Sequence, residues 1–206
     1  MRPLLAVIGA YLFGSIPFGY LIVRATKGSD IRHSGSGGTG ATNVSRSAGK
    51  LAGVITLGLD VIKGAAAVVI ARFILEDQPV AAAAWWISLA AIAVIAGHIF
   101  PIWLRFHGGK GVATAVGVFL VLAPAAVGCA GVVFITIVCI TRYVSLGSIV
   151  AAAIMPLFVW LLNEFVEPVP NIQALMTAAI AGALLIVFAH RGNIGRLVSG
   201  KESKFR

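Results

Sequence analysis

Three short polar segments of this 206-residue chain combine glycine with permanently charged side chains. They are RHSGSGGTGATNVSR at 32–46, RFHGGKG at 105–111 and HRGNIGRLVSGKE at 190–202. Glycine lets backbone N–H groups turn towards a common point, and arginine and lysine supply the positive charge that binds a phosphate group. The composition of these segments therefore predicts the binding of a phosphorylated small molecule.

The composition of the first segment favours an anion-binding nest of backbone N–H groups, followed by an arginine. Its closely spaced glycines are Gly35, Gly37, Gly38 and Gly40. Ser36 adds a hydroxyl donor, and Arg46 carries a planar guanidinium group suited to phosphate. The alternative interpretation is a flexible Gly/Ser linker whose charges only set membrane topology.

The second segment has glycines directly before an expected helix. Lys110, flanked by Gly108, Gly109 and Gly111, can reach an anion held at the helix N-terminus. The pattern is not a Walker A loop, because Leu104 stands where that motif needs glycine and Gly111 stands where it needs serine or threonine. ATP hydrolysis is therefore not expected, and the alternative is a tight basic turn.

The third segment follows the last apolar run. His190 and Asn193 are three residues apart and share one face if the helix continues. His190 could then donate to a phosphate or move a proton. The alternative is a basic tail that binds anionic lipid.

Several familiar catalytic patterns are missing from the sequence. None of the four histidines has an acid five positions later, so there is no His-x-x-x-x-Asp dyad, and no GxSxG elbow occurs. Carboxylates do not cluster, and Cys129 and Cys139 are isolated. We expect no metal and no cofactor, and a reaction that depends on positioning and charge stabilisation.

The elements that must position these segments are membrane helices. The chain is 59% hydrophobic and 11% charged, against about 25% charged in soluble domains, and its mean hydropathy is +1.00. Apolar runs long enough to cross a bilayer, or nearly so, cover 4–23, 51–75, 80–104, 145–162 and 172–189. The stretch 112–140 is divided by Pro124, which predicts two short helices or a re-entrant pair.

Charge predicts the orientation of these spans. Basic turns hold Arg105, Lys110 and Arg142, whereas the turns at 76–79 and 164–170 carry only acidic charge. The sequence therefore predicts one all-α membrane domain over 1–206 with seven spans, its N-terminus outside and its C-terminus and three polar segments in the cytoplasm. Basic residues in cytoplasmic loops account for most of the net charge of +9. The charge therefore needs no nucleic-acid partner, and nucleic-acid binding is not expected.

Two pairs of polar residues lie within or beside the apolar runs. Asp60 and Lys63 are spaced i,i+3 inside the second run, which favours an ion pair within the helix. Ser145 and Ser148 follow Arg142 and could point into a cytoplasmic site, although serines in membrane helices often bond back to their own helix.

Together these motifs resemble those of the bacterial acyl-phosphate-dependent glycerol-3-phosphate acyltransferases, the PlsY family. The matching stretches are GSGGTGATNVSR at 35–46, GHIFPIWLRFHGGKGVATA at 97–115, RYVSLGS at 142–148 and HRGNIGRLVSGKE at 190–202. The resemblance implies a seven-helix enzyme of the bacterial inner membrane. It also implies acyl transfer from acyl phosphate to the 1-hydroxyl of glycerol 3-phosphate, giving lysophosphatidate and phosphate early in phospholipid synthesis.

The resemblance also implies roles for individual residues. The implied substrate ligands are Ser36, Arg46, Lys110 with Gly108, Gly109 and Gly111, Ser148 in preference to Ser145, His190 and Asn193. Of these, Arg46, Lys110, His190 and Asn193 would be catalytic through positioning and charge, and Glu202 would be a structural partner in the tail. The proton acceptor is either a bound phosphate or His190.

The implied partners are the two substrates and membrane lipids, and the soluble enzyme that makes acyl phosphate is a candidate partner; the oligomeric state is open. Two other functions fit the sequence less well. A transporter or flippase for an anionic metabolite or lipid would use broken helices, but its polar groups would gather at the bilayer midplane. A lipid-binding scaffold would tolerate the loss of Ser36 or Asn193, whereas a catalytic site should not.

Overall fold

The structure, a computed structural model, describes residues 1–204 of the chain, and no strand occurs among them. Its helices are α1 (Arg2–Gly14), α2 (Phe18–Lys27), α3 (Ala41–Ala48), α4 (Lys50–Ile74), α5 (Val80–Ile99), α6 (Val112–Leu122), α7 (Pro124–Thr141), α8 (Val144–Phe165), α9 (Ile172–Ala189) and α10 (Arg191–Val198). Two short 3-10 turns, η1 (Ile31–His33) and η2 (Ile102–Leu104), lie in the loops.

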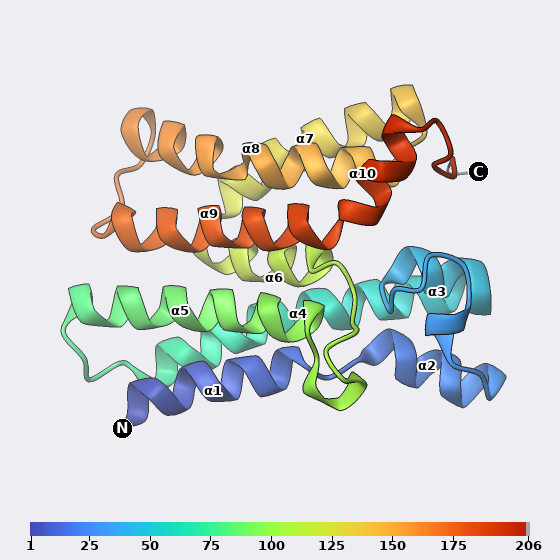
Figure 1. The fold of residues 1–206 in the computed structure, drawn as a ribbon. Coiled ribbons are helices and arrows are strands. Elements are labelled where there is room, and N and C mark those ends of the chain that lie inside the picture. The colour runs from blue at the N-terminus through green and yellow to red at the C-terminus, as the bar shows by residue number, and fades with distance from the viewer. Residues whose placement is uncertain (205–206) are drawn as a thin grey trace.

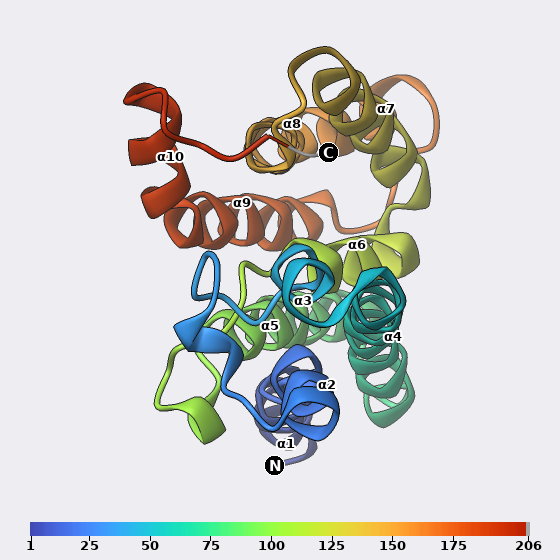
Figure 2. The ribbon, with the colours of Figure 1, turned by 90° about the vertical axis from the view of Figure 1, so that its right-hand side faces the viewer.

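The long helices form a bundle in two halves (Figures 1 and 2). Helix α1 packs on α5 and α4 on α6 in one half, α7 and α9 pack on α8 in the other, and α5 meets α9 between them. Small residues allow close contact: a Cβ at Gly64 would overlap the carbonyl of Thr114, and one at Gly117 that of Val61. This is the small-residue packing expected where helices associate within a bilayer.

Six segments of the described chain are long and apolar enough to cross a membrane. The first joins α1 and α2, and the others correspond to α4, α5 with η2, α7, α8 and α9. Helix α6 has 11 residues, or about 16 Å at 1.5 Å per residue, which is about half the hydrocarbon thickness. The predicted division at Pro124 is present, with α6 ending at Leu122 and Pro124 opening α7.

The first apolar run, predicted as one membrane span, contains a break that its sequence did not locate. Its helix breaks between Gly14 and Phe18, and Pro17 explains part of the break because it lacks an N–H and disfavours helical geometry in the residue before it. The break also frees the carbonyl of Ile16, which accepts a hydrogen bond of 3.0 Å from Lys63 Nζ. A lysine from another helix thus stabilises the interruption, and the sequence of the run alone did not reveal this.

The N-terminus and α10 lie at opposite ends of the bundle (Figure 1). The loop between α2 and α3 lies at the same end as α10, and the backbone N–H of Thr39 donates to the carbonyl of Gly108, which ties the second polar segment to the first (3.4 Å). We call this end, with residues 28–49, 105–111 and 190–204, the polar end.

Candidate functional site

Asn43 organises the glycine-rich loop of the first segment. Its side-chain Nδ2 donates to the carbonyls of Gly38 (2.9 Å) and Ser34 (3.0 Å), and its Oδ1 accepts from the backbone N–H of Ser36 (3.2 Å). Gly35 has a positive φ of 57°, and a Cβ there would overlap Asn43 Oδ1, so glycine is needed at this position. The loop is therefore a held structure rather than a flexible linker, and it leaves Ser36 exposed at its tip.

The two arginines that bound the first segment have different environments. Arg32 binds Asp30 through two contacts, Nε to Oδ1 at 3.0 Å and Nη2 to Oδ2 at 2.6 Å, and this hydrogen bonding lowers the pKa of Asp30 to about 2. Arg32 also donates to the carbonyl of Leu104 (3.3 Å), so it ties the segment to η2. Arg46, exposed on the last turn of α3, has no side-chain hydrogen bond or ion pair within residues 1–204 and is available to an anion.

The second segment folds back on the end of α5. The N–H of Gly108 donates to the carbonyl of Ile99 (3.1 Å), and the N–H of Gly109 donates to that of His98 (3.0 Å). Gly111, at φ 79°, is the N-cap of α6. Lys110 therefore stands directly before a helix N-terminus, where the helix dipole and free N–H groups favour an anion.

Charges from the first and third segments act on Lys110 of the second. Burial lowers the pKa of this lysine to about 8, Glu202 opposes that shift, and Arg196 and Arg46 add to it. The lysine is still mostly protonated at neutral pH, with a weaker hold on its proton than usual. Lys110 is the point at which the three polar segments meet electrostatically.

His190 is buried at the junction of α9 and α10, with 1% of its surface exposed. Its Nδ1 lies 2.8 Å from the carbonyl of Ile186, and since a carbonyl only accepts, we assign the proton to Nδ1. Burial lowers the pKa of His190 to about 4, the Ile186 contact opposes this, and Lys110 adds to it. At neutral pH the ring is therefore uncharged, and its Nε2 is an acceptor rather than a donor.

Glu202 joins the tail to two helices. Its Oε1 accepts from Asn193 Nδ2 (2.6 Å) and Ser145 Oγ (2.7 Å), and its Oε2 accepts from Arg196 Nε (2.7 Å). Burial raises the pKa of Glu202, but these three hydrogen bonds outweigh burial and lower it overall. The carboxylate is thus ionised at neutral pH and holds the tail against α8 and α10.

The two serines of α8 are both buried but have different partners. Ser145 donates to Glu202, whereas Ser148 donates back to the carbonyl of Val144 at 2.9 Å. The predicted ligand Ser148 is therefore bonded to its own helix in this structure, and Ser145 contacts the acid that also binds Asn193.

The ion pair predicted inside the second run is present. Lys63 Nζ lies 2.8 Å from Asp60 Oδ1, and both residues are 1% exposed. His98 joins them, with Nδ1 at 3.5 Å from the same oxygen. This cluster lies in the helices beside the polar end, not among the three segments.

Sequence reasoning named Asn43 only as one of several hydrogen-bond donors in the first segment, and it did not single out Arg196 or His98. Asn43 carried a usable signal, because asparagine side chains commonly bond to nearby backbone in loops and helix starts. Arg196 looked like any basic residue of the tail. His98 lies within an apolar run, and only its contacts across helices distinguish it.

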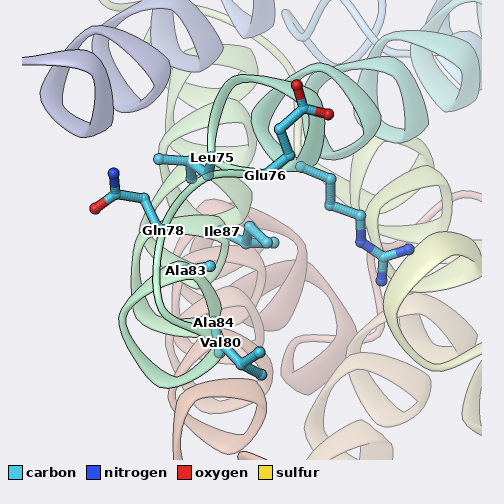
Figure 3. A pocket seen from close by; sticks show the side chains of 8 residues that line it. Leu75, Glu76, Gln78, Val80, Ala83, Ala84 and Ile87 are labelled. Atoms are coloured by element: carbon cyan, nitrogen blue, oxygen red, sulfur yellow. The ribbon is translucent and has the colours of Figure 1, made fainter.

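A surface pocket lies between α4 and α5 at the far end of the bundle from α10 (Figures 1 and 3). It is lined by Arg72, Leu75, Glu76, Gln78, Val80, Ala83, Ala84 and Ile87. None of the predicted site residues contributes to this pocket.

Comparison with protein families matches residues 4–200 to the glycerol-3-phosphate acyltransferase family. The glycerol-3-phosphate acyltransferase of Trichlorobacter lovleyi is 45% identical over 200 residues, covering 97% of this chain and 96% of that protein. The one from Geobacter sulfurreducens is 45% identical over 206 residues, covering 100% and 99%.

Solved structures give the same result. A crystal structure of PlsY (YgiH), described as an integral membrane glycerol 3-phosphate acyltransferase in its glycerol 3-phosphate form, matches with a TM-score of 0.87 and 39% identity, covering 100% of this chain and 96% of that one. The lysophosphatidic acid form of the same protein matches with a TM-score of 0.84 and 36% identity. The chain therefore belongs to the glycerol-3-phosphate acyltransferase family and has its all-helical, integral membrane fold.

Proposed function

We propose that this chain transfers a fatty acyl group from acyl phosphate to the 1-hydroxyl of glycerol 3-phosphate. The products are 1-acyl-glycerol 3-phosphate and inorganic phosphate, an early step of phospholipid synthesis. The observation that carries this proposal is the position of Lys110 before the N-terminus of α6, where charges of the first segment (Arg46) and of the third (Arg196, Glu202) act on it. Family membership supports the acyltransferase reaction, and both of the proposed substrates are phosphate anions.

We propose that the substrates bind to groups from each segment. Gly108 and Gly109 line the site with N–H groups that are already bonded to the end of α5, and His190 offers an acceptor rather than a donor. The ligands are Ser36, Arg46, Gly108, Gly109, Lys110, Gly111, Ser148, His190 and Asn193. Backbone N–H groups at the start of α6 and the free guanidinium of Arg46 support this assignment, because they are unpaired or oriented for an anion. Glu202 holds Asn193 and Arg196 in place without touching substrate.

In the reaction, the 1-hydroxyl oxygen attacks the acyl carbonyl carbon, and the bond from that carbon to the phosphate oxygen breaks. Inorganic phosphate leaves with the electron pair, so the enzyme needs no nucleophile of its own. Lys110 and Arg46 stabilise the charge that develops on the leaving group.

The proton of the attacking hydroxyl has two possible acceptors. His190 Nε2 is unprotonated at neutral pH, but a pKa of about 4 makes it a weak base. A bound phosphate has a second pKa near ~6 and is the stronger acceptor. We therefore propose that a phosphate oxygen accepts the proton of the 1-hydroxyl and that His190 takes part only in binding the substrate.

For the topology, we propose seven crossings with the N-terminus outside and the polar end in the cytoplasm, in the bacterial inner membrane. The opposite positions of the N-terminus and α10 along the bundle support an odd number of crossings. Lysine and arginine gather at the polar end, as expected of cytoplasmic loops. Helix α6, although short, and α7 would then each cross the membrane.

The deciding experiment is an acyl-transfer assay on purified protein in lipid with glycerol 3-phosphate and palmitoyl phosphate, and with palmitoyl-CoA as the control donor. We expect lysophosphatidate from palmitoyl phosphate alone. Arg46→Ala and Lys110→Ala should each lower kcat/KM by about 100-fold or more, since each removes a charge at the reacting phosphate. Folded protein that forms no product with either donor would contradict the proposal and favour the transporter.

The same assay separates the two proton acceptors. His190→Gln should retain appreciable turnover if a phosphate takes the proton and His190 only binds the substrate. A loss of kcat with unchanged affinity would instead identify His190 as the base.

A further inference from the structure

We propose that His98 is a positioning residue for the phosphate-binding loop at 108–110, and that the buried Asp60–Lys63 ion pair holds its imidazole ring in place. The inference rests on the proposed acyltransferase function, because it concerns the loop that carries Lys110. It assigns a role to polar residues that the mechanism above does not use.

The loop is pressed against His98 on two sides. The backbone carbonyl of His98 accepts from the N–H of Gly109 (3.0 Å), and a Cβ at Gly108 would overlap that same carbonyl. A Cβ at Gly109 would overlap Nε2 of the His98 ring. The loop therefore lies on the main chain of His98 and Ile99 at Gly108, and on the His98 ring at Gly109.

The opposite edge of the ring faces the ion pair. His98 Nδ1 lies 3.5 Å from Asp60 Oδ1, a contact of opposite polarity, and it makes no hydrogen bond within residues 1–204. Asp60 in turn pairs with Lys63 at 2.8 Å, and Lys63 donates to the carbonyl of Ile16 at 3.0 Å. A continuous chain of polar contacts thus runs from the break between α1 and α2 to the loop.

This chain of contacts leaves the ring little freedom. His98 is 6% exposed and the two ions are 1% exposed, so none of them can exchange its partners for water. Charges within a membrane protein must remain paired, and a packed interior does not deform to fill a gap. The loop at 108–110 contacts this ring, and its position is consequently fixed relative to α4 and α5.

The consequence for function is the position of Lys110, the next residue along. Reacting groups that move by about 1 Å can lose ~100-fold in rate. We expect that removing the ring lets the loop sink towards α5, which moves the ammonium group and the start of α6 away from the phosphate. The protein should remain folded, because the bundle packs mainly through other residues.

The first test measures kcat, and KM for each substrate, in His98→Ala, with Lys110→Met as the reference and Ser88→Ala as the control. Ser88 lies on the same helix and is buried, but it is outside the cluster. His98→Ala should lower kcat/KM by about 10- to 100-fold and raise KM for the same substrate as Lys110→Met does. Ser88→Ala should match the wild type. Wild-type kinetics in folded His98→Ala, or an equal rise in both KM values, would overturn the proposal.

A double-mutant cycle tests the contact itself. Gly109→Ala should impair the wild type, because its new methyl group meets the His98 ring. In the His98→Ala background that methyl group meets open space, so its penalty should shrink by about tenfold or more. Independent, multiplicative penalties would show that the ring does not support the loop.

Two further measurements keep the outcome decisive. If His98→Ala does not fold, His98→Gln replaces it: a side chain that refills part of the space should give an intermediate loss, and full activity would count against the proposal. If the wild type transfers no acyl group, the proposed acyltransferase function is wrong, whatever the role of His98. Calorimetric binding of glycerol 3-phosphate to the same variants then tests the positioning role of His98 separately, and equal affinity in all of them would refute that role.

Discussion

Two carboxylates, Asp60 and Glu202, each lie at the centre of a polar cluster, but their surroundings differ. Asp60 lies between helices with one ammonium partner at 2.8 Å and a distant imidazole at 3.5 Å. Glu202 lies at the polar end and accepts three hydrogen bonds of 2.6 to 2.7 Å from a serine, an asparagine and an arginine. The first acid is nearly inaccessible, and the second keeps 9% of its side chain exposed.

The difference shows how the same chemical group serves two purposes. An acid enclosed by apolar helices must keep its counter-ion, so its replacement should act mainly on stability and, through His98, on the loop. An acid at the polar end is closer to water, so its replacement should act mainly on the charges around it. Substitutions can disrupt each cluster separately. Those at Asp60 should act mainly on stability, and those at Glu202 mainly on the neighbouring charges.

The largest expected effect follows from Asp60→Asn. This change leaves Lys63 as an unpaired ion among apolar helices, and breaking a buried pair by removing one partner costs about 3–5 kcal/mol. Thermal unfolding in detergent micelles should show a large fall in the midpoint.

The control is Asp60→Asn combined with Lys63→Gln, which removes both charges. The double variant should recover a substantial part of the lost stability, because replacing a whole buried pair is far less costly than breaking it. A single variant as stable as the wild type would mean that the pair is hydrated and that the comparison between the two clusters does not hold.

The next effect follows from Glu202→Gln, which keeps an acceptor for Ser145 and Asn193 but removes the charge. We expect a loss of about 1 kcal/mol, since the side chain of Arg196 is 41% exposed and solvent screens the pair. The lowered pKa of Glu202 makes this contribution fully present above the unfolded pKa and lost as pH falls through the lower, folded value. The difference between Glu202→Gln and wild type should therefore vanish in acid.

The same change should alter the pH dependence of substrate binding. Glu202 opposes the lowering of the Lys110 pKa, so its neutralisation should bring that pKa below about 8. In the wild type, kcat/KM for glycerol 3-phosphate should fall as pH rises through about 8, and in Glu202→Gln the fall should begin at lower pH. Lys110→Arg is the control, because arginine stays protonated throughout this range. An unchanged alkaline limb in Glu202→Gln would show that the tail does not act on Lys110.

Much of the fold follows from the sequence because it depends on local composition. Apolar runs predicted α4, α5, α8 and α9 to within a few residues, and Pro124 predicted the division between α6 and α7. The break between α1 and α2 was missed, since Lys63 on another helix stabilises it. A helix break that is stabilised by a residue of another helix is hard to recognise in the sequence of the broken segment itself.

For the site, too, features that depend on local sequence were predictable and features that depend on contacts between distant residues were not. The prediction that the three segments bind phosphate rests on their own glycines and charges, and it stays a prediction. The roles of Asn43 and His98 depend on what their side chains touch after folding, and that information is not local. Spacing indicated the partnership of Asp60 and Lys63, whereas the third member, His98, comes from a separate run 35 or more residues along the chain.

The last prediction concerns the two buried serines of α8, one of which belongs to the Glu202 cluster. Ser145 gives its hydrogen to Glu202 and Ser148 gives its hydrogen to the carbonyl of Val144, so neither hydroxyl offers a donor to phosphate in this structure. We propose that Ser148 turns from its helix to the bound phosphate, since releasing a backbone carbonyl that already accepts a helical bond costs little. Ser148→Ala should then raise KM for glycerol 3-phosphate by about tenfold, the loss of one hydrogen bond to a charged group, with no change in the unfolding midpoint. Ser145→Ala should do the reverse, with a slightly lower midpoint and an unchanged KM, because its partner is the structural acid. The opposite pattern would make Ser145 the ligand and would move the substrate towards the Glu202 cluster.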